Sequence, residues 1–202
     1  KAFELADTYR MTVVILSDAY IGQMMEPVEL SGEMAEGERK PWAVYGDKES
    51  RSNLITSIYM DPNLLEQHNQ LLQGVYAQVE RECTAYDTYQ VEDADAVFVA
   101  YGITSRICMS AVDLLRKRGI KAGLIRPQTL YPFPKQPIEE AAGRNALLIA
   151  AELSNGMMAD DVELAVGGTS RVLRYGWLGG VIPTVSDIAD RAAKDLEEGG
   201  MQ

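Results

Sequence analysis

Continuous apolar runs alternate with amphipathic segments along the second half of the chain. Four runs lack polar alternation, namely Asp95–Gly102, Lys121–Pro127, Asn145–Leu153 and Ser170–Gly176. Such runs are typical of strands that are buried on both faces of a sheet. Strands interleaved with helices predict an α/β fold, a three-layer α/β/α arrangement with a mainly parallel sheet and right-handed crossovers.

The expected helices are marked by apolar residues three or four positions apart. These residues are Ile107, Ala111, Leu114 and Leu115, then Met158, Val162 and Val166, and finally Ile188, Ala192 and Leu196. Thr184 and Asp187 have the spacing of a capping box, which predicts that the last helix begins there. An earlier helix of about six turns is predicted to begin at Asp61, a favourable N-cap followed by proline.

The beginning of the chain is less regular. Apolar residues near the start predict a helix, and the β-branched run Thr12–Asp18 predicts a buried strand. Glu29–Ser52 is rich in Gly, Glu, Lys and Ser, so we interpret it as an exposed connection with a short strand at Trp42–Tyr45. The chain opens on lysine inside a helical pattern, and we therefore expect it to be a fragment of a longer polypeptide.

Composition narrows the function classes. The formal net charge of −11 argues against nucleic acid and anionic membrane surfaces as partners. No apolar run reaches the length of about 20 residues that spans a bilayer, and we expect a cytoplasmic protein. Cys83 and Cys108 are too few and too far apart for a metal or iron–sulfur site, so we expect buried free thiols. His68, the one histidine, lies on the apolar stripe of the long helix and is predicted to pack there rather than act as a base.

Two loops carry candidate contact residues. In "AYGITSR", Gly102 and Arg106 lie where a helix start could hold a phosphate or carboxylate, although a tight turn capped by Thr104 or Ser105 is the favoured interpretation. The candidates in "SDAYIGQMMEP" are Asp18, Tyr20 and Gln23, just beyond a predicted strand. For this second loop, a ligand site and a simple turn remain equally open.

Glu152 lies at the end of the third predicted strand and is interpreted as a solvated carboxylate, with Ser154 or Asn155 capping the following helix. The acidic residues of that helix, Asp160, Asp161 and Glu163, are expected to face solvent. No nucleophile–base pair, metal quartet or complete phosphate loop is present. The residues alone therefore predict no catalytic site.

The segment "GLIRPQTLYPFPKQP" is expected to be a stiff connection. Its prolines are Pro127, Pro132, Pro134 and Pro137. The first ends a strand, the next two stiffen the exit, and the last begins a short helix. Tyr131 and Phe133 are expected to cover the end of the sheet. Arg126 is the exception, a charged residue at a strand end, and is a candidate contact for a subunit or ligand.

Several stretches together resemble one family. They are "LSDAYIGQMMEP", "NLITSIYMDPNLLEQHNQLLQ", "EDADAVFVAYGITSRI", "AVDLLRKRGIKAGLIRPQTLYPFP" and "LGGVIPT". In this order they are similar to the α subunit of 2-oxoacid:ferredoxin oxidoreductases, and specifically to the VorB type of the 2-ketoisovalerate enzymes. The resemblance covers nearly the whole chain.

The resemblance implies an enzyme complex that oxidatively decarboxylates a 2-oxoacid to an acyl-CoA and passes the electrons to ferredoxin. Thiamine diphosphate, Mg²⁺ and iron–sulfur clusters serve that complex, together with a thiamine-binding β subunit and a ferredoxin-like subunit. Residues 1–25 would end the thiamine-pyrimidine domain, 26–74 would form a linker and the start of the long helix, and 75–202 would form a domain like the C-terminal domain of transketolase. The resemblance implies that this chain contributes no catalytic or cofactor-binding residue. It also implies an oligomeric assembly.

The chain departs from the family pattern at Met157, where a glutamine is frequent, and at Trp177, where an arginine is frequent. The alternatives are a 2-oxoglutarate or pyruvate enzyme subunit, a free-standing module that binds a nucleotide or other anion, and a purely structural dimerisation domain.

Overall fold

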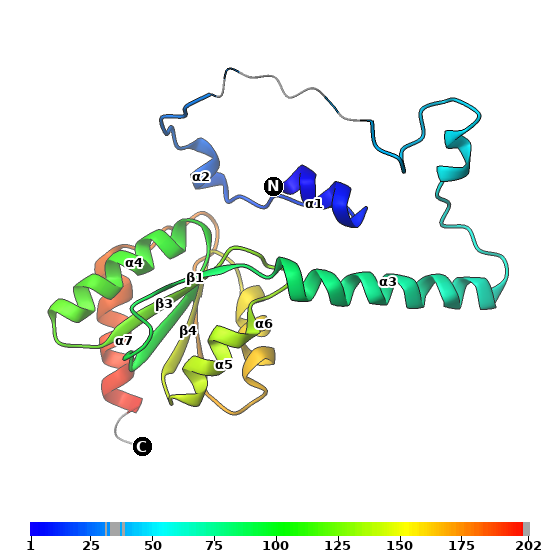
Figure 1. Ribbon diagram of the computed structural model, residues 1–202. Coiled ribbons are helices and arrows are strands. Elements are labelled where there is room, and N and C mark those ends of the chain that lie inside the picture. Colours follow the sequence, from blue (N-terminus) through cyan, green and yellow to red (C-terminus); the bar gives the residue numbers. More distant parts are fainter. Residues whose placement is uncertain (31, 33–36, 38, 200–202) are drawn as a thin grey trace. The chain divides into compact units, whose positions relative to one another are not determined.

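A computed structural model describes residues 1–30, 32, 37 and 39–199 of the chain (Figure 1). The chain divides into two compact units. One consists of Lys1–Gln23 with Ala77–Gln202, and the other is Met24–Tyr76. The predicted connection at Glu29–Ser52 lies partly outside the described residues.

The first unit contains a five-stranded sheet. Its strands are β1 (Tyr86–Tyr89), β2 (Ala96–Ala100), β3 (Ala122–Pro127), β4 (Leu147–Glu152) and β5 (Val172–Gly176). They lie in the order β1-β3-β2-β4-β5, with β2 to β5 parallel and β1 antiparallel to β3. The mainly parallel sheet is therefore confirmed, and each of its parallel strands falls within one of the four apolar runs.

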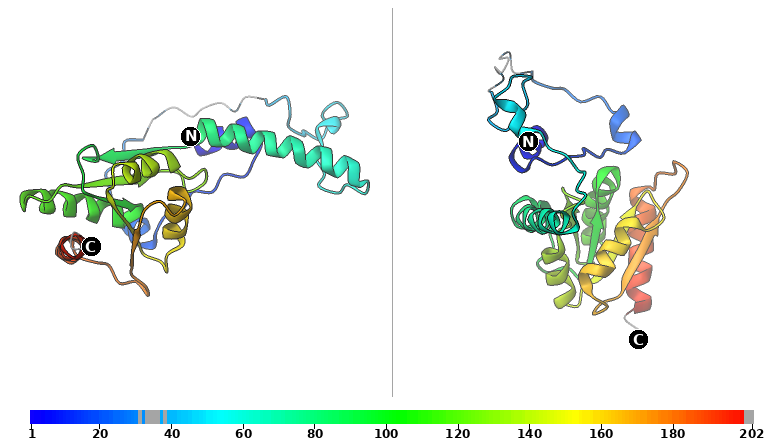
Figure 2. Two further views of the ribbon diagram at one scale, coloured as in Figure 1. Left: turned by 90° about the horizontal axis from the view of Figure 1, so that it is seen from below. Right: turned by 90° about the vertical axis from the view of Figure 1, so that its right-hand side faces the viewer.

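Helices cover both faces of this sheet (Figure 2). The helices of the chain are α1 (Ala2–Tyr9), α2 (Ala19–Gln23), α3 (Pro62–Cys83), α4 (Gly102–Lys117), α5 (Lys135–Gly143), α6 (Met157–Val166) and α7 (Val185–Gly199), with a 3₁₀ turn at Ser50–Asn53. One buried cluster joins α5 and α6 to one face of the sheet, and a second joins α4 and α7 to the other. The three-layer α/β/α prediction is confirmed.

Strand β2 shows why these runs lack polar alternation. Val97 and Val99 belong to the cluster under α5 and α6, whereas Phe98 and Ala100 belong to the cluster under α4 and α7. Successive side chains of a strand point to opposite faces, so a strand covered on both sides needs apolar residues at every position. All five residues of β2 are buried.

The predicted starts of α7 and α3 are confirmed. The Thr184 amide donates to Asp187 at 3.0 Å, and the Asp187 amide donates to the Thr184 hydroxyl at 3.2 Å, which completes the capping box. Asp61 accepts a hydrogen bond from the Asn63 amide at 2.8 Å before α3. His68 stacks on Tyr59 with ring centroids 4.8 Å apart, as expected for a packed helix histidine.

Three local predictions are wrong. Thr12–Asp18 forms no strand, and its residues Val14, Ile15 and Leu16 are 70–78% exposed, because no other described segment pairs with them. Trp42–Tyr45 also forms no strand, since the Tyr45 amide donates to the Ser50 hydroxyl and turns the chain into a loop. Helix α5 begins at Lys135 rather than at Pro137, and its first turn tolerates that proline.

Arg116, near the end of α4, hydrogen-bonds to the start of β3 and to the segment that follows β1. Its guanidinium donates to the carbonyl oxygens of Ala122 and Gln90 and to the Asp93 carboxylate, each at 2.7 Å. The Arg116 side chain is 22% exposed. Its hydrogen bonds to Asp93 keep the pKa of that carboxyl below its usual value.

Replacing Arg116 with alanine should lower the free energy of unfolding by about 2 kcal/mol, because two carbonyls lose a charged donor. Urea unfolding followed by circular dichroism measures this loss. Arg118→Ala is the matched control, since Arg118 makes an exposed ion pair with Asp190 and should cost less than about 1 kcal/mol. Equal losses in the two variants would contradict the role given to Arg116.

The same pair predicts a pH dependence. A carboxyl with a lowered pKa in the folded chain stabilises the fold above its unfolded pKa of about 4, and the contribution is lost as the pH falls through the folded value. The stability difference between the wild-type chain and Arg116→Ala should therefore narrow as the pH decreases from 6 toward about 3. A difference that stays constant over this range would exclude the ionised Asp93 as a contributor.

Candidate functional site

The sheet changes its winding direction between β2 and β4. The helix after β2 is α4, on one face, whereas the helix after β4 is α6, on the other face. In open α/β sheets, ligands bind at the carboxyl ends of the strands where the winding reverses. The candidate site therefore consists of the residues at the starts of α4 and α6.

The Asp18 carboxylate lies against the first turn of α4. Its carboxylate accepts hydrogen bonds from the Ile103 amide at 2.8 Å and from the Ile21 amide at 2.7 Å. The capping predicted for Thr104 or Ser105 is wrong, because their hydroxyls donate backward to the carbonyls of Tyr101 and Gly102. The chain's own carboxylate therefore fills the position that could have held an external anion.

The Glu152 carboxylate likewise accepts hydrogen bonds from backbone amides at the start of α6. It is only 1% exposed and accepts hydrogen bonds from the amides of Met158 at 3.0 Å and Ala159 at 2.9 Å. The Ser154 hydroxyl also donates to it. The interpretation of Glu152 as a solvated carboxylate is wrong. So is the capping by Ser154 or Asn155, because the N-cap is Gly156, whose left-handed backbone has a φ of +94°.

Tyr101, which sequence reasoning missed, is close enough to both carboxylates to feel their charges. Burial raises the pKa of its phenol, and the negative charges of Glu152 and Asp18 raise it further. The half-buried ring packs against the cluster under α5 and α6. Its place directly after a central strand was the available signal, and its phenol stays protonated at neutral pH, so it can donate a hydrogen bond.

The remaining candidates do not gather at this point. Arg126 forms an ion pair with Asp87 on β1 at 3.1 Å, across the β1–β3 pairing that sets the two residues opposite each other. Arg106 is exposed on α4, and Tyr20 and Gln23 are exposed on α2. Of the six predicted contact residues, Asp18 and Gly102 lie directly against each other.

The acidic residues of α6 are exposed, as predicted. Arg174 of β5 pairs with Asp160 at 2.7 Å and with Glu163 at 2.6 Å. Asp161 has a raised pKa, first because of partial burial and then because of the charges of Asp160 and Glu152. This side of α6 is therefore partly neutralised by the edge strand.

The proline-rich connection is held by Thr129, another residue that the sequence did not single out. Its hydroxyl donates to the Pro132 carbonyl at 2.7 Å and accepts from the Ala85 amide at 3.0 Å. Phe133 packs against the cluster under α5 and α6, as expected. Tyr131 is 63% exposed, so the prediction that it covers the end of the sheet is wrong.

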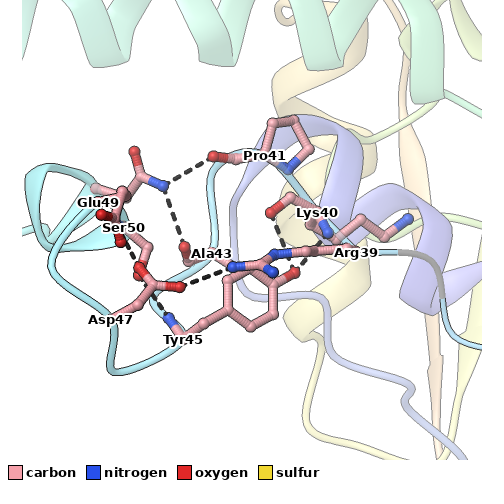
Figure 3. A pocket seen from close by; sticks show the side chains of 9 residues that line it. Arg39, Lys40, Pro41, Ala43, Tyr45, Asp47, Glu49 and Ser50 are labelled. Carbon is pink, nitrogen blue, oxygen red and sulfur yellow. Dashed lines mark hydrogen bonds and ion pairs between the residues drawn. The ribbon is translucent and has the colours of Figure 1, made fainter.

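A pocket of about 380 Å³ lies within the second unit (Figure 3). Its lining includes Arg39, Tyr45, Asp47 and Ser50. Arg39 pairs with Asp47 at 2.7 Å and lies over the Tyr45 ring. The pKa of Asp47 is lowered, chiefly by hydrogen bonds from Ser50 and also by Arg39. These polar groups bond to one another, so the network accounts for the fold of the loop.

Other site types find no support in the described part of the chain. No group of three His, Cys, Asp or Glu side chains there is arranged to hold a metal ion. Both cysteines are free, and burial raises the pKa of Cys108 to about 12, which makes its thiol unreactive. None of the described helices combines the length and apolarity needed to cross a membrane.

Residues 94–188, which include Tyr101, Gly102 and Glu152, match the family model for pyruvate:ferredoxin oxidoreductase core domain II. Over 169 residues, 82% of this chain, the sequence is 48% identical to the ketoisovalerate oxidoreductase subunit VorB of Methanothermobacter marburgensis. The chain belongs to the 2-oxoacid:ferredoxin oxidoreductase family. It spans about half the length of such relatives, since the match covers 47% of that VorB.

More distant members of the family are similar as well. The 2-oxoglutarate synthase subunit KorA of Methanothermobacter marburgensis is 27% identical over 95% of this chain and 58% of its own length. The 2-oxoglutarate:ferredoxin oxidoreductase from Magnetococcus marinus, solved with 2-oxoglutarate, coenzyme A and succinyl-CoA bound, superposes with a TM-score of 0.57. This match covers 68% of this chain and 24% of that one, at 18% identity, and therefore shows the fold alone.

Both departures from the family pattern have a local structural explanation. Met157 is the first residue of α6 and is exposed, so no buried contact depends on it. Trp177 packs against the cluster under α4 and α7 and meets Tyr175 edge-on, with ring centroids 6.3 Å apart. Trp177 therefore makes an apolar contact at the position where the expected family pattern has an arginine.

Replacing Glu152 with alanine should lower the free energy of unfolding by about 3 kcal/mol, because two amides at the start of α6 lose a buried charged acceptor. Chemical denaturation of the chain measures the loss. Glu163→Ala is the control, since that exposed carboxylate forms an ion pair with Arg174 and its loss should cost less than about 1 kcal/mol. If Glu152→Ala also cost less than about 1 kcal/mol, the Glu152 carboxylate would have to be regarded as solvated.

Proposed function

We propose that this chain is the C-terminal part of the α subunit, of the VorB type, of a 2-oxoacid:ferredoxin oxidoreductase. The complex would oxidatively decarboxylate a 2-oxoacid, first of all 2-ketoisovalerate, to an acyl-CoA. The observation that carries this proposal is the 48% identity to a VorB subunit over 82% of the chain. Because that match covers 47% of the relative, the activity would belong to a longer subunit and its partners.

Within the complex, this part would assemble subunits and shape the rim of the thiamine site without supplying a catalytic residue. Two exposed apolar stretches support an assembly role. Val14, Ile15 and Leu16 are mostly exposed, and α3 has no buried residue although Leu64 and Leu71 are apolar. Large exposed apolar surfaces are typical of protein contacts.

We place three domains on the chain. Residues 1–25 would complete a thiamine-pyrimidine domain, in which Thr12–Asp18 would gain the strand neighbours that the described chain lacks. Residues 26–74 would be a linker with the start of the long helix, and 75–202 would be the domain similar to transketolase. Thiamine diphosphate, Mg²⁺ and iron–sulfur clusters would be held by the rest of a cytoplasmic complex, which includes a thiamine-binding β subunit and a ferredoxin-like subunit.

The alternative of a free-standing anion or nucleotide module loses its main argument. That module would use the helix start at Gly102, where the Asp18 carboxylate already accepts a hydrogen bond from the Ile103 amide. A bound carboxylate repels a phosphate at the same amide. The observation that favours a second candidate substrate, 2-oxoglutarate, is the 27% identity to KorA.

The test is reconstitution of the full-length α subunit with its partner subunits. The complex should reduce ferredoxin only when 2-oxoacid and CoA are both present, and a subunit lacking residues 75–202 should fail to assemble in gel filtration. Normal assembly and turnover without these residues would refute the role given to them.

Substrate choice is measured in the same complex. We expect kcat/KM for 2-ketoisovalerate to exceed that for 2-oxoglutarate and pyruvate by about tenfold or more, because a site for a branched apolar chain rejects a second carboxylate. A preference for 2-oxoglutarate would leave the family in place and replace the proposed substrate with the alternative.

A further inference from the structure

The Asp18 carboxylate connects two segments that are far apart in the sequence. One oxygen accepts from Ile21 in α2, and the other accepts from Ile103 in the first turn of α4, 85 residues beyond Asp18. Both bonds are charge-assisted, and such bonds are about twice as strong as neutral ones. A single half-buried side chain therefore holds α2 on the domain that contains the sheet.

Gly102 is matched to this carboxylate. Its backbone has a φ of +59°, a conformation that side chains other than glycine rarely adopt. A Cβ built on Gly102 would also come within clashing distance of the nearer Asp18 oxygen. The left-handed turn and the absence of a side chain therefore serve the same contact.

The beginning of the chain is held at a second point. The Tyr9 hydroxyl at the end of α1 donates to the Glu82 carboxylate near the end of α3 at 2.7 Å. Between Tyr9 and Asp18 the chain has no helix or strand beyond the end of α1, and Val14 to Leu16 are exposed. The Asp18 hydrogen bonds therefore connect α2, with its exposed Tyr20 and Gln23, to the start of α4.

We propose that Asp18 and Gly102 form a latch that fixes residues 12–23 on the sheet domain, and that Asp18 is a positioning residue rather than a ligand contact. The latch sets where Tyr20 and Gln23 are presented. Its effect on turnover rests on the function proposed above, in which this segment borders the thiamine site. The latch itself is a property of the folded chain and does not depend on that function.

Hydrogen exchange with mass spectrometry on the full-length subunit tests the latch. Asp18→Ala should accelerate exchange about tenfold or more in peptides covering residues 12–23 and the first turn of α4, while β2 to β5 remain protected. Asp18→Asn keeps one oxygen acceptor and should give an intermediate effect. Asp190→Ala removes a carboxylate that contacts the opposite end of α4 and should leave both regions unchanged.

Combining the variants separates a latch from two independent structural sites. Gly102→Ala alone should accelerate exchange at the start of α4, because the new methyl group displaces Asp18. In the Asp18→Ala background the additional acceleration should be smaller, since only the backbone strain remains. Unchanged exchange in Asp18→Ala, or equal acceleration by Gly102→Ala in both backgrounds, would overturn the proposal.

The reconstituted complex provides the functional readout. Asp18→Ala should leave subunit assembly intact and lower kcat/KM about tenfold, with partial recovery in Asp18→Asn. Normal kcat/KM in Asp18→Ala would overturn the positioning role. If the wild-type complex fails to oxidise any 2-oxoacid, the proposed function is refuted, while the exchange measurements still decide whether the latch exists.

Discussion

The amide groups at the starts of α4 and α6 require acceptors, and the arrangement of the carboxyl end of the sheet follows from how they are satisfied. The first turn of a helix leaves amides without partners in the helix and carries a partial positive charge. Asp18 serves α4 and Glu152 serves α6, on opposite faces of neighbouring strands. At each of these helix starts the chain turns with a positive φ at a glycine, Gly102 or Gly156.

These two carboxylates determine which ligands the point of reversed winding between β2 and β4 can accept. Carboxylates already occupy the two helix starts that would attract a phosphate, and the Tyr101 phenol is held in its neutral form. The two carboxylates and the phenol therefore offer hydrogen-bonding groups but no positive charge. Such groups disfavour the binding of a nucleotide phosphate at these helix starts.

The fold was predictable from the sequence because its determinants are local. The four parallel strands are buried on both faces, so each is an uninterrupted apolar run, and the helix at Thr184 has both members of its capping box three residues apart. β1 was missed because Tyr86–Tyr89 is short and lies at an edge, where polar residues are tolerated. The strand predicted at Thr12–Asp18 did not form because β-branched residues give a tendency that only a neighbouring strand can realise.

The site was predictable only in part, because its contacts are long-range. Asp18 and Gly102 are each candidate contact residues in the sequence, yet nothing in the sequence indicates that residues 84 positions apart touch each other. Glu152 was judged by the usual exposure of carboxylates, and its burial depends on two amides that α6 brings to it from six and seven residues away. Arg126 was judged without its partner, because Asp87 lies on the strand that was missed.

The sheet domain buries its own apolar side chains, whereas other described segments of the chain leave theirs exposed. The two clusters of the sheet domain are covered by its own helices, and the described chain has no buried side-chain polar atom without a partner. The exposed apolar residues, by contrast, are frequent before and within α3 and in the stretch between α1 and α2. Since apolar surface is stabilised by removal from water, these exposed segments are the parts of the chain best suited to contacts with other polypeptide segments.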